Sequence, residues 1–293
     1  MGAVEARHLH LMRVLITGAQ GQVGLELVEA FATHPNYEVI AIDRRQLDVA
    51  DRDSVLQAIC SAQPDAVVHA AAWTDVDGCQ LDPSRALQVN ALGTRHVAEG
   101  ARLAGARVCY LSTDYVFAGD ATSPYTEWDA TGPRSAYGSS KLGGEQELGH
   151  DATIVRTSWV CGRFGRNFVR SILAAAAERD ELSVVDDQHG CPTFADDLAS
   201  MIVRLVVSRL PGTFHVTNQG ATTWYGLACA AMQCAGLDPG RIKPIATADL
   251  QPPRPAPRPP WSVLDNSALR LSGIPLLSDF HEPLERLVKH IDG

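Results

Sequence analysis

A tyrosine and a lysine four residues apart, Tyr137 and Lys141, are the residues of this sequence best suited to acid–base chemistry. They lie in the stretch YGSSKLGGE (137–145), in a chain with only three lysines. In a helix over 136–149 the two side chains would lie on one face, one turn apart. A neighbouring ammonium group and the positive charge of an oxidised nicotinamide would lower the pKa of the phenol, which predicts proton transfer. An ordinary surface pair is the alternative.

The stretch LSTDYVFAGD (111–120) brings hydroxyl and carboxyl groups to the end of a predicted strand. The carboxyl ends of parallel strands border the ligand crevice of open α/β sheets, so Ser112, Thr113 and Asp114 would face a ligand. Thr113 would hydrogen-bond a substrate carbonyl beside Tyr137. A Ser-Thr-Asp run alone is more often a turn or a helix cap, so this interpretation depends on the tyrosine and lysine.

Three glycines, in RVLITGAQGQVGLEL, separate a predicted strand from a predicted helix and indicate a dinucleotide site. Such glycines allow a tight turn, backbone approach to the pyrophosphate and close helix–strand packing. Asp43, at the end of the second strand, would bind the adenosine ribose and favour NAD, whereas Arg44 and Arg45 would favour the 2′-phosphate of NADP. We expect either cofactor to be accepted. A solvated strand end is the alternative for Arg45.

The elements that would position these residues alternate between short β-branched runs and longer runs of helical period. This pattern predicts an α/β fold, a Rossmann-type doubly wound parallel sheet with a smaller, irregular C-terminal substrate lobe. The predicted strands span 13–17, 38–43, 66–71, 107–113, 153–158 and 182–186. The predicted helices span about 22–33, 53–62, 82–104, 136–149, 167–179, 195–208 and 223–235.

The alternation loosens after about residue 160, and LQPPRPAPRPPWSVLD (250–265) is too rich in proline for a helix or a central strand. We therefore predict a dinucleotide-binding domain over 12–160, to which segments at about 180–210 return. Residues 161–293 would form mainly the substrate-binding lobe. Residues 1–11 precede the first strand, and we expect a disordered extension there.

The composition of the chain limits its possible binding partners and the cellular compartment in which it would work. A net charge of −9 argues against nucleic acid and anionic membranes, because such partners need a basic face. No apolar run reaches the roughly 18 residues of a membrane span. Seven scattered cysteines without a C-x-x-C pattern indicate neither a disulfide framework nor a zinc site. We expect a cytoplasmic protein with no metal site of its own.

Seven stretches resemble, in order and over nearly the whole chain, the dTDP-4-dehydrorhamnose reductases of the extended short-chain dehydrogenase/reductase superfamily. They are TGAQGQVG, HAAAWTDVDGCQ, STDYVFAGD, YGSSKLGGE, RTSWVCG, DDQHGCPTFADDLA and RPPWSVLD. The resemblance implies reduction of the C4 ketone of dTDP-4-dehydro-L-rhamnose to dTDP-L-rhamnose with NADPH or NADH. This reaction is the final step of dTDP-rhamnose biosynthesis, which serves cell-envelope polysaccharides.

The resemblance also implies roles for single residues. Tyr137 would be the proton donor, Lys141 would lower its pKa and bind the nicotinamide ribose, and Thr113 would orient the carbonyl. The cofactor-binding residues would be Gly18, Gln20, Gly21, Gln22, Val23, Gly24, Asp43, Arg44, Asp48, Val49, Ala70, Ala71, Ala72, Trp73, Thr74, Tyr137 and Lys141. The substrate-binding residues would be Thr113, Asp114, Tyr137, Trp159, Asn167 and Arg258.

Arg258 is a candidate ligand for the diphosphate of the sugar nucleotide, with a polyproline surface linker as the alternative. Two positions depart from the family pattern. The family usually has tyrosine at the position of Cys161, and tyrosine or histidine at the position of Trp73. We therefore expect altered packing near the sugar or the nicotinamide. Some relatives bind Mg²⁺ at a dimer interface through glutamates that have no match here. The chain would be a monomer or a homodimer.

Two other functions stay open at the level of the sequence. A nucleotide-sugar epimerase or dehydratase of the same superfamily would retain its NAD between turnovers. A non-catalytic regulatory subunit, like that of methionine adenosyltransferase, also keeps the Tyr-Lys pair. That subunit lacks the Ser-Trp pair found here as Ser158 and Trp159, which favours a sugar-nucleotide enzyme.

Overall fold

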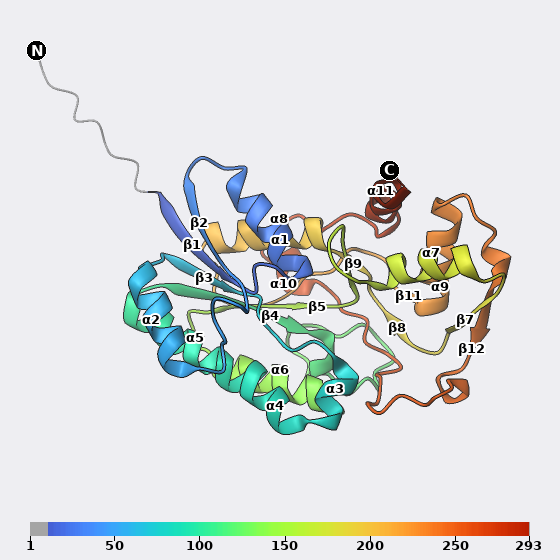
Figure 1. The fold of residues 1–293 in the computed structure, drawn as a ribbon, viewed down its shortest axis with the longest axis horizontal. Helices are drawn as coiled ribbons and strands as arrows, with labels where there is room; N and C mark the ends of the chain where they lie inside the picture. Colours follow the sequence, from blue (N-terminus) through green and yellow to red (C-terminus); the bar gives the residue numbers. More distant parts are fainter. Residues whose placement is uncertain (1–10, 293) are drawn as a thin grey trace, which may run out of the picture.

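A parallel sheet forms the centre of the molecule, which a computed structural model describes over residues 11–292 (Figure 1). The extension predicted for 1–11 thus lies, apart from Leu11, outside the described residues. Within them, six strands pair in the order β10-β5-β4-β3-β1-β2. The strands are β1 (Met12–Thr17), β2 (Tyr37–Ile42), β3 (Ala66–His69), β4 (Arg107–Thr113), β5 (Thr153–Thr157) and β10 (Gly212–His215). The order reverses between β1 and β3, the kind of switch point at which open α/β sheets bind ligands.

Helices cover both faces of the sheet because its strands are apolar on both sides (Figure 1). In β1, Val14 and Ile16 belong to one core and Leu15 to the other, since successive side chains point to opposite faces. The first core is covered by α1 (Gln22–Ala32) and α8 (Ala195–Val207), and the second by α2 (Arg52–Ala62) and α5 (Gly93–Ala104), while α6 (Ala136–Gln146) packs against α5 and β4. The predicted doubly wound Rossmann-type class is confirmed.

A second group of elements lies to the right of the sheet in Figure 1. It contains the helices α7 (Phe168–Glu178), α9 (Trp224–Cys234) and α11 (His281–Asp292), and a parallel pair of strands, β7 (Leu182–Val185) and β12 (Ile242–Ile245). The remaining elements are short: α3 (Val76–Leu81), α4 (Pro83–Leu87), α10 (Ser267–Leu271), β6 (Val160–Cys161), β8 (His189–Gly190), β9 (Thr193–Phe194), β11 (Thr222–Thr223), and single turns at Gln88–Leu92, Asp114–Val116, Pro239–Arg241 and Thr247–Asp249. The division of the chain near residue 160 stays a prediction. No helix between residues 11 and 292 is both long and apolar enough to cross a bilayer.

Two predicted elements differ from the structure. The strand predicted at 182–186 forms as β7 but pairs with β12, and the sixth place in the central sheet belongs to β10, which was not predicted. The helix predicted over 82–104 forms from Pro83 to Ala104, but its hydrogen bonds take the π-helical pattern at Gln88–Leu92, between α4 and α5, while the backbone at both junctions stays right-handed helical. Both differences arise from pairing and packing with distant segments, which local patterns do not encode.

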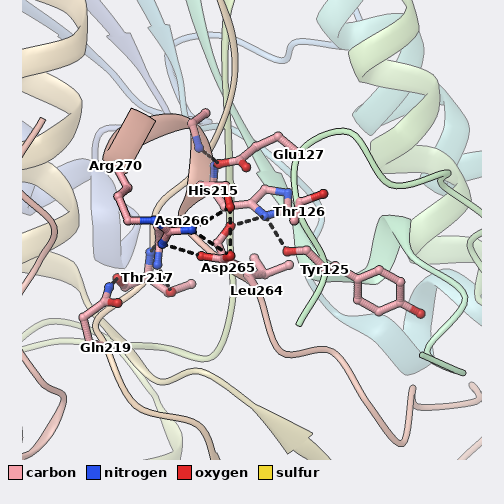
Figure 2. Close-up of polar contacts among 12 residues, drawn as sticks. Tyr125, Thr126, Glu127, His215, Thr217, Gln219, Leu264, Asp265, Asn266 and Arg270 are labelled. Carbon is pink, nitrogen blue, oxygen red and sulfur yellow. Dashed lines mark hydrogen bonds and ion pairs between the residues drawn. The ribbon is translucent and has the colours of Figure 1, made fainter. Parts of the chain in front are cut away.

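A buried network of hydrogen bonds connects the end of β10 to two segments that are distant in sequence (Figure 2). The Nδ1 atom of His215 lies 3.1 Å from the carbonyl oxygens of both Tyr125 and Asp265, so it carries the proton and donates to them. Glu127 accepts from the backbone N–H groups of His215 at 2.9 Å and of Ala268 at 3.1 Å. The network therefore joins residues 125–127, β10 and the segment 265–268.

The same network reaches the helix that carries Tyr137 and Lys141. The ring of Phe117 stacks on Tyr125 with 4.3 Å between centroids and meets His215 edge-on. The guanidinium of Arg156 lies over that phenylalanine ring, 5.1 Å from its centroid, and binds Glu145 of α6 through two hydrogen bonds of 2.9 and 2.7 Å. A continuous set of contacts thus links β10 to α6.

Acid should weaken the fold through His215. Burial, with a smaller effect from the charge of Arg156, lowers the pKa of His215 to about 3, whereas an unfolded histidine titrates near about 6.5. The unfolded chain therefore binds more protons between these two values, and the free energy of unfolding falls as pH drops through that window. Urea unfolding at pH 7 and pH 5 should reveal a loss in the wild type and a smaller loss in His215→Gln. Equal losses would contradict this role.

Candidate active site

Two adjoining pockets lie at the carboxyl edge of the sheet and share Gly18, Gly21, Ala70 and Ala72. They enclose about 950 and 1330 Å³ of empty space, including the open mouths. Of the predicted site residues, the first pocket is lined by Gly18, Gln20, Gly21, Asp43, Arg44, Asp48, Val49, Ala70, Ala71, Ala72 and Trp73. The second is lined by Gly18, Gly21, Gln22, Val23, Gly24, Ala70, Ala72, Thr74, Thr113, Asp114, Tyr137, Lys141 and Trp159. The fold thus brings together every predicted site residue except Asn167 and Arg258.

The glycine turn between β1 and α1 is built for close approach. Gly18 has φ +70°, and a Cβ there would lie 2.7 Å from the backbone nitrogen of Ala71. A Cβ on Gly24 would overlap the carbonyl oxygen of Gly18, so helix and strand pack without room for a methyl group. A Cβ on Gly21 would meet only the Gly18 oxygen, at 3.1 Å, and would otherwise project into the shared pocket. The residues present therefore fit a dinucleotide whose pyrophosphate lies against this turn.

The first pocket is lined both by a residue predicted to favour NAD and by one predicted to favour NADP. Asp43 and Arg44 line it, whereas Arg45 does not. One carboxylate oxygen of Asp43 accepts from the backbone N–H groups of Arg45 at 2.8 Å and Gln46 at 3.1 Å, which fixes the orientation of the carboxylate. Carboxylate and guanidinium therefore flank one space, in which ribose and phosphate would compete as ligands.

Tyr137 and Lys141 lie one turn apart on α6 and line the second pocket together with Thr113, the last residue of β4. The helix starts where Ser135 caps it, by accepting from the N–H of Gly138 at 3.1 Å. All three side chains are buried, at 9, 3 and 5% exposure. The structure therefore brings the three predicted catalytic groups into one enclosed space.

Lys141 is held by the sheet below it. Its Nζ atom donates to the carbonyl oxygen of Leu111 at 2.6 Å and lies 4.0 Å from the centroid of the Tyr110 ring. Burial lowers the pKa of Lys141 to about 7, although the charge of Glu145 opposes this effect. Burial of His69, with a smaller effect from the charge of Lys141, lowers the pKa of this histidine to about 3.

Among the groups of the protein itself, burial dominates the pKa of Tyr137, and the lowering predicted from the sequence, which included the charge of an oxidised nicotinamide, stays a prediction. Burial raises the pKa of the phenol well above its usual value, and the Thr113 hydroxyl only partly opposes this shift. The Lys141 ammonium group is directed at the Leu111 carbonyl oxygen. A raised pKa keeps the phenol protonated at neutral pH, which suits a proton donor to a ketone.

Asp114 adds a buried carboxyl group to the same pocket. One of its oxygens accepts from the Thr113 hydroxyl at 2.9 Å, and the other has no partner among the described residues. Burial raises the pKa of Asp114 to about 6. An unpartnered buried oxygen is costly, and a sugar hydroxyl would satisfy it.

Asn90, in the π-helical turn, was missed from the sequence. Its side chain binds both backbone groups of Trp73, accepting at 2.8 Å and donating at 3.0 Å, and donates to Ser140 of α6 at 2.9 Å. It therefore fixes the pocket-lining segment after β3 against the helix that carries the tyrosine. An asparagine inside a long helical pattern, where it is a poor helix former, was the available signal.

Trp159 lies in the left-handed region, with φ +49°. Its indole stacks on Trp224 of α9 at 3.7 Å between centroids, and a Cβ on Gly190 would lie 2.5 Å from its ring. Trp224 also lines the second pocket and was not predicted, because a tryptophan at a helix start resembles any core residue. The stacked indoles form an apolar wall of the pocket.

Asn167 and Arg258 do not line either pocket. Asn167 caps α7, where it accepts from the Arg170 N–H at 3.1 Å and donates to Gln22 at 3.1 Å. Arg258 pairs with Asp77 through contacts of 3.1 and 2.8 Å and lines a separate pocket beside Tyr115. Both side chains are already occupied by neighbouring protein groups.

Trp73 and Cys161, the two positions that depart from the family pattern, lie in different environments. Trp73 lines the first pocket and carries the guanidinium of Arg85 over its ring, 4.6 Å from the centroid. Cys161 packs in the core with Val169 and Phe194, and burial raises its pKa to about 12. The thiol is therefore a core group rather than a nucleophile.

Over residues 11–292, no group of three or more His, Cys, Asp or Glu side chains is arranged to hold a metal ion. A shared Mg²⁺ site between two chains would draw on a second molecule. Both the Mg²⁺ site at a dimer interface, known from some relatives, and the oligomeric state stay predictions.

The switch-point crevice, the glycine turn and a helical Tyr-Lys pair beside a buried threonine define a class: dinucleotide-dependent oxidoreductases of the short-chain dehydrogenase/reductase type. A model of the RmlD substrate binding domain matches residues 12–292. The chain belongs to the dTDP-4-dehydrorhamnose reductase family.

Individual relatives agree with this assignment. The chain is 42% identical to a dTDP-4-dehydrorhamnose reductase of Streptomyces griseus, over 89% of this chain and 88% of that one. It is 41% identical to a dTDP-4-keto-6-deoxy-D-glucose reductase of Streptomyces niveus, over 89% and 91%. A crystal structure of dTDP-4-dehydrorhamnose reductase from Bacillus anthracis, in complex with NADP, superposes with a TM-score of 0.91 at 37% identity and covers 96% of this chain and 99% of that one.

Removing the charge of Glu145 should be far more damaging than removing that of Glu147. The side chains of Glu145 and Arg156 are 6 and 7% exposed, so Glu145→Gln leaves a buried guanidinium without its counter-charge, at a cost of about 3–5 kcal/mol. Glu147 makes an equally bidentate pair with Arg95 at the surface, worth about 0–1 kcal/mol. Chemical unfolding of both variants measures the two losses. Comparable losses would refute the importance of burial.

Proposed function

We propose that this protein reduces the C4 ketone of dTDP-4-dehydro-L-rhamnose to the alcohol of dTDP-L-rhamnose, with NADPH or NADH as the reductant. The observation that carries this proposal is the convergence of Tyr137, Lys141 and Thr113 in a pocket that adjoins the glycine turn. The relatives at about 40% identity, which are named as reductases of dTDP-linked 4-ketosugars, support it.

A nicotinamide bound in this crevice would supply a hydride for the carbonyl carbon. Tyr137 donates its proton to the carbonyl oxygen, and the raised pKa of its phenol ensures that this proton is present at neutral pH. The Thr113 hydroxyl, at the end of β4, would orient the same oxygen by turning its one proton from Asp114 to the ketone. Lys141 lies beside the tyrosine at the nicotinamide end of the crevice, where its amine would hold the cofactor ribose.

The sugar would lie between a polar and an apolar wall. Asp114 offers a buried oxygen without a partner in the described chain, which suits a sugar hydroxyl. Opposite in character, the Trp159 and Trp224 indoles stack parallel and offer a face for the apolar side of a 6-deoxy sugar. The pocket thus offers both a polar and an apolar surface, which matches the two sides of a 6-deoxy sugar.

A second candidate substrate is a related dTDP-linked 4-ketosugar. The relative at 41% identity named for dTDP-4-keto-6-deoxy-D-glucose favours it. The same three catalytic residues would serve, because these ketones differ at ring carbons other than C4.

We assign the reaction to the cytoplasm as part of the same proposal. All seven cysteines are free thiols, as is usual for proteins of a reducing compartment. We propose a monomer or a homodimer.

The test is a spectrophotometric assay of purified protein with enzymatically generated dTDP-4-dehydro-L-rhamnose and either cofactor. Absorbance at 340 nm should fall, and Tyr137→Phe should slow turnover by about 10² to 10⁴-fold, because it removes the proton donor. Tyr37→Phe, at the opposite edge of the sheet, should match the wild type.

Absence of turnover with both cofactors, or an active Tyr137→Phe, would refute the reductase. Tightly retained NAD and sugar interconversion without net oxidation of NADPH would identify an epimerase or dehydratase instead.

A further inference from the structure

Arg166 is a cation at the second pocket that has no counter-charge. It lies in the loop between β6 and α7, is exposed and lines the space that also contains Tyr137 and Lys141. Within residues 11–292 its guanidinium makes no ion pair or hydrogen bond. Arg163, three residues earlier in the same loop, is bound by both Glu26 and Glu29, so the chain leaves one arginine of this loop unpaired.

The loop that carries Arg166 is fixed rather than free. The side chain of Gln22 donates to the Val160 carbonyl oxygen at 3.0 Å. The side chain of Asn167 donates to Gln22 at 3.1 Å and to the Gly162 carbonyl oxygen at 2.8 Å. Arg166 is therefore the immediate neighbour of a residue that is bound to the start of α1.

Charge is distributed unevenly along this pocket. Its inner end holds the Asp114 carboxyl group, 2% exposed and with one oxygen unpartnered in the described chain. The same pocket is lined by the buried Lys141 amine and by the exposed, unpaired guanidinium of Arg166. A ligand with hydroxyl groups at one end and phosphates at the other matches that polarity, because guanidinium groups bind phosphate oxygens through charge-assisted, bidentate hydrogen bonds.

We propose that Arg166 is a diphosphate-binding residue of this pocket. The inference rests on the proposed function, which brings two diphosphates into the crevice: the pyrophosphate of the dinucleotide and the diphosphate of the nucleotide sugar. Arg258, the arginine predicted to bind the sugar-nucleotide diphosphate, has its guanidinium occupied by Asp77 and lines another pocket. Arg166 is the arginine of the second pocket that remains available.

The experiment measures binding directly, so that it does not depend on turnover of any sugar. NADPH affinity is measured by fluorescence titration, and dTDP affinity by calorimetry with NADP⁺ present, for the wild type, Arg166→Ala and Arg166→Lys. Arg102→Ala is the matched control, because Arg102 is exposed near the end of α5, next to the amino end of β4. Melting temperatures verify that the variants remain folded.

Arg166→Ala should weaken one of the two ligands by about ten- to a hundredfold, the range expected for a lost hydrogen bond to a charged group. Arg166→Lys should retain part of the affinity, and Arg102→Ala should retain all of it. Weaker NADPH binding alone identifies the cofactor pyrophosphate, and weaker dTDP binding alone identifies the sugar nucleotide. Unchanged affinity for both ligands, or an equal loss in Arg102→Ala, overturns the proposal. Intact binding without ketone reduction would refute the proposed function instead.

Discussion

The buried ion pair between Arg156 of β5 and Glu145 of α6 is the contact on which the arrangement of the site depends. The Arg156 guanidinium donates to the two Glu145 carboxylate oxygens at 2.9 and 2.7 Å. The hydroxyl of Ser112, near the end of β4, also donates to this carboxylate. Desolvation makes such a pair a poor source of net stability, but it penalises every arrangement in which one partner is missing. The pair therefore fixes where α6 lies on the sheet more than it stabilises the fold.

The composition of α6 follows from that fixed position. A Cβ on Gly138 would overlap the carbonyl oxygen of Tyr115, and one on Gly144 would overlap the hydroxyl of Tyr110. A Cβ on Gly143 would lie 3.0 Å from that of Ala91. Three glycines weaken a helix by about 1 kcal/mol each relative to alanine, so packing against the neighbouring segments, rather than helix propensity, stabilises α6. That close packing holds the tyrosine and lysine at the edge of the crevice.

Much of this site could be predicted because its signals are local. The glycine turn needs only a strand, three glycines and a helix, and the spacing of Tyr137 and Lys141 is a property of a single helix. The strands of the central sheet from β1 to β5 could be recognised from their apolar β-branched runs. Each of these features follows from one short stretch of consecutive residues.

The features that could not be predicted depend on pairing between distant segments. β10 is only Gly212–His215 and becomes a strand by pairing with β5. Asn90 acquires its role from contacts with Trp73 and Ser140, and Arg258 is occupied by an aspartate 181 residues away. The burial of Tyr137, which raises the pKa of its phenol, could not be predicted either, since burial is a property of the assembled fold and not of helical spacing.

The most direct measurement of the central claim follows a labelled hydride from cofactor to sugar. NADPH that carries deuterium at the transferable position of C4 would be incubated with the protein and dTDP-4-dehydro-L-rhamnose, and the product analysed by NMR. Hydride transfer in the crevice beside Tyr137 predicts one deuterium atom, at C4 of the sugar and in a single configuration. Product without deuterium at C4, or with deuterium at another ring carbon, would contradict the account.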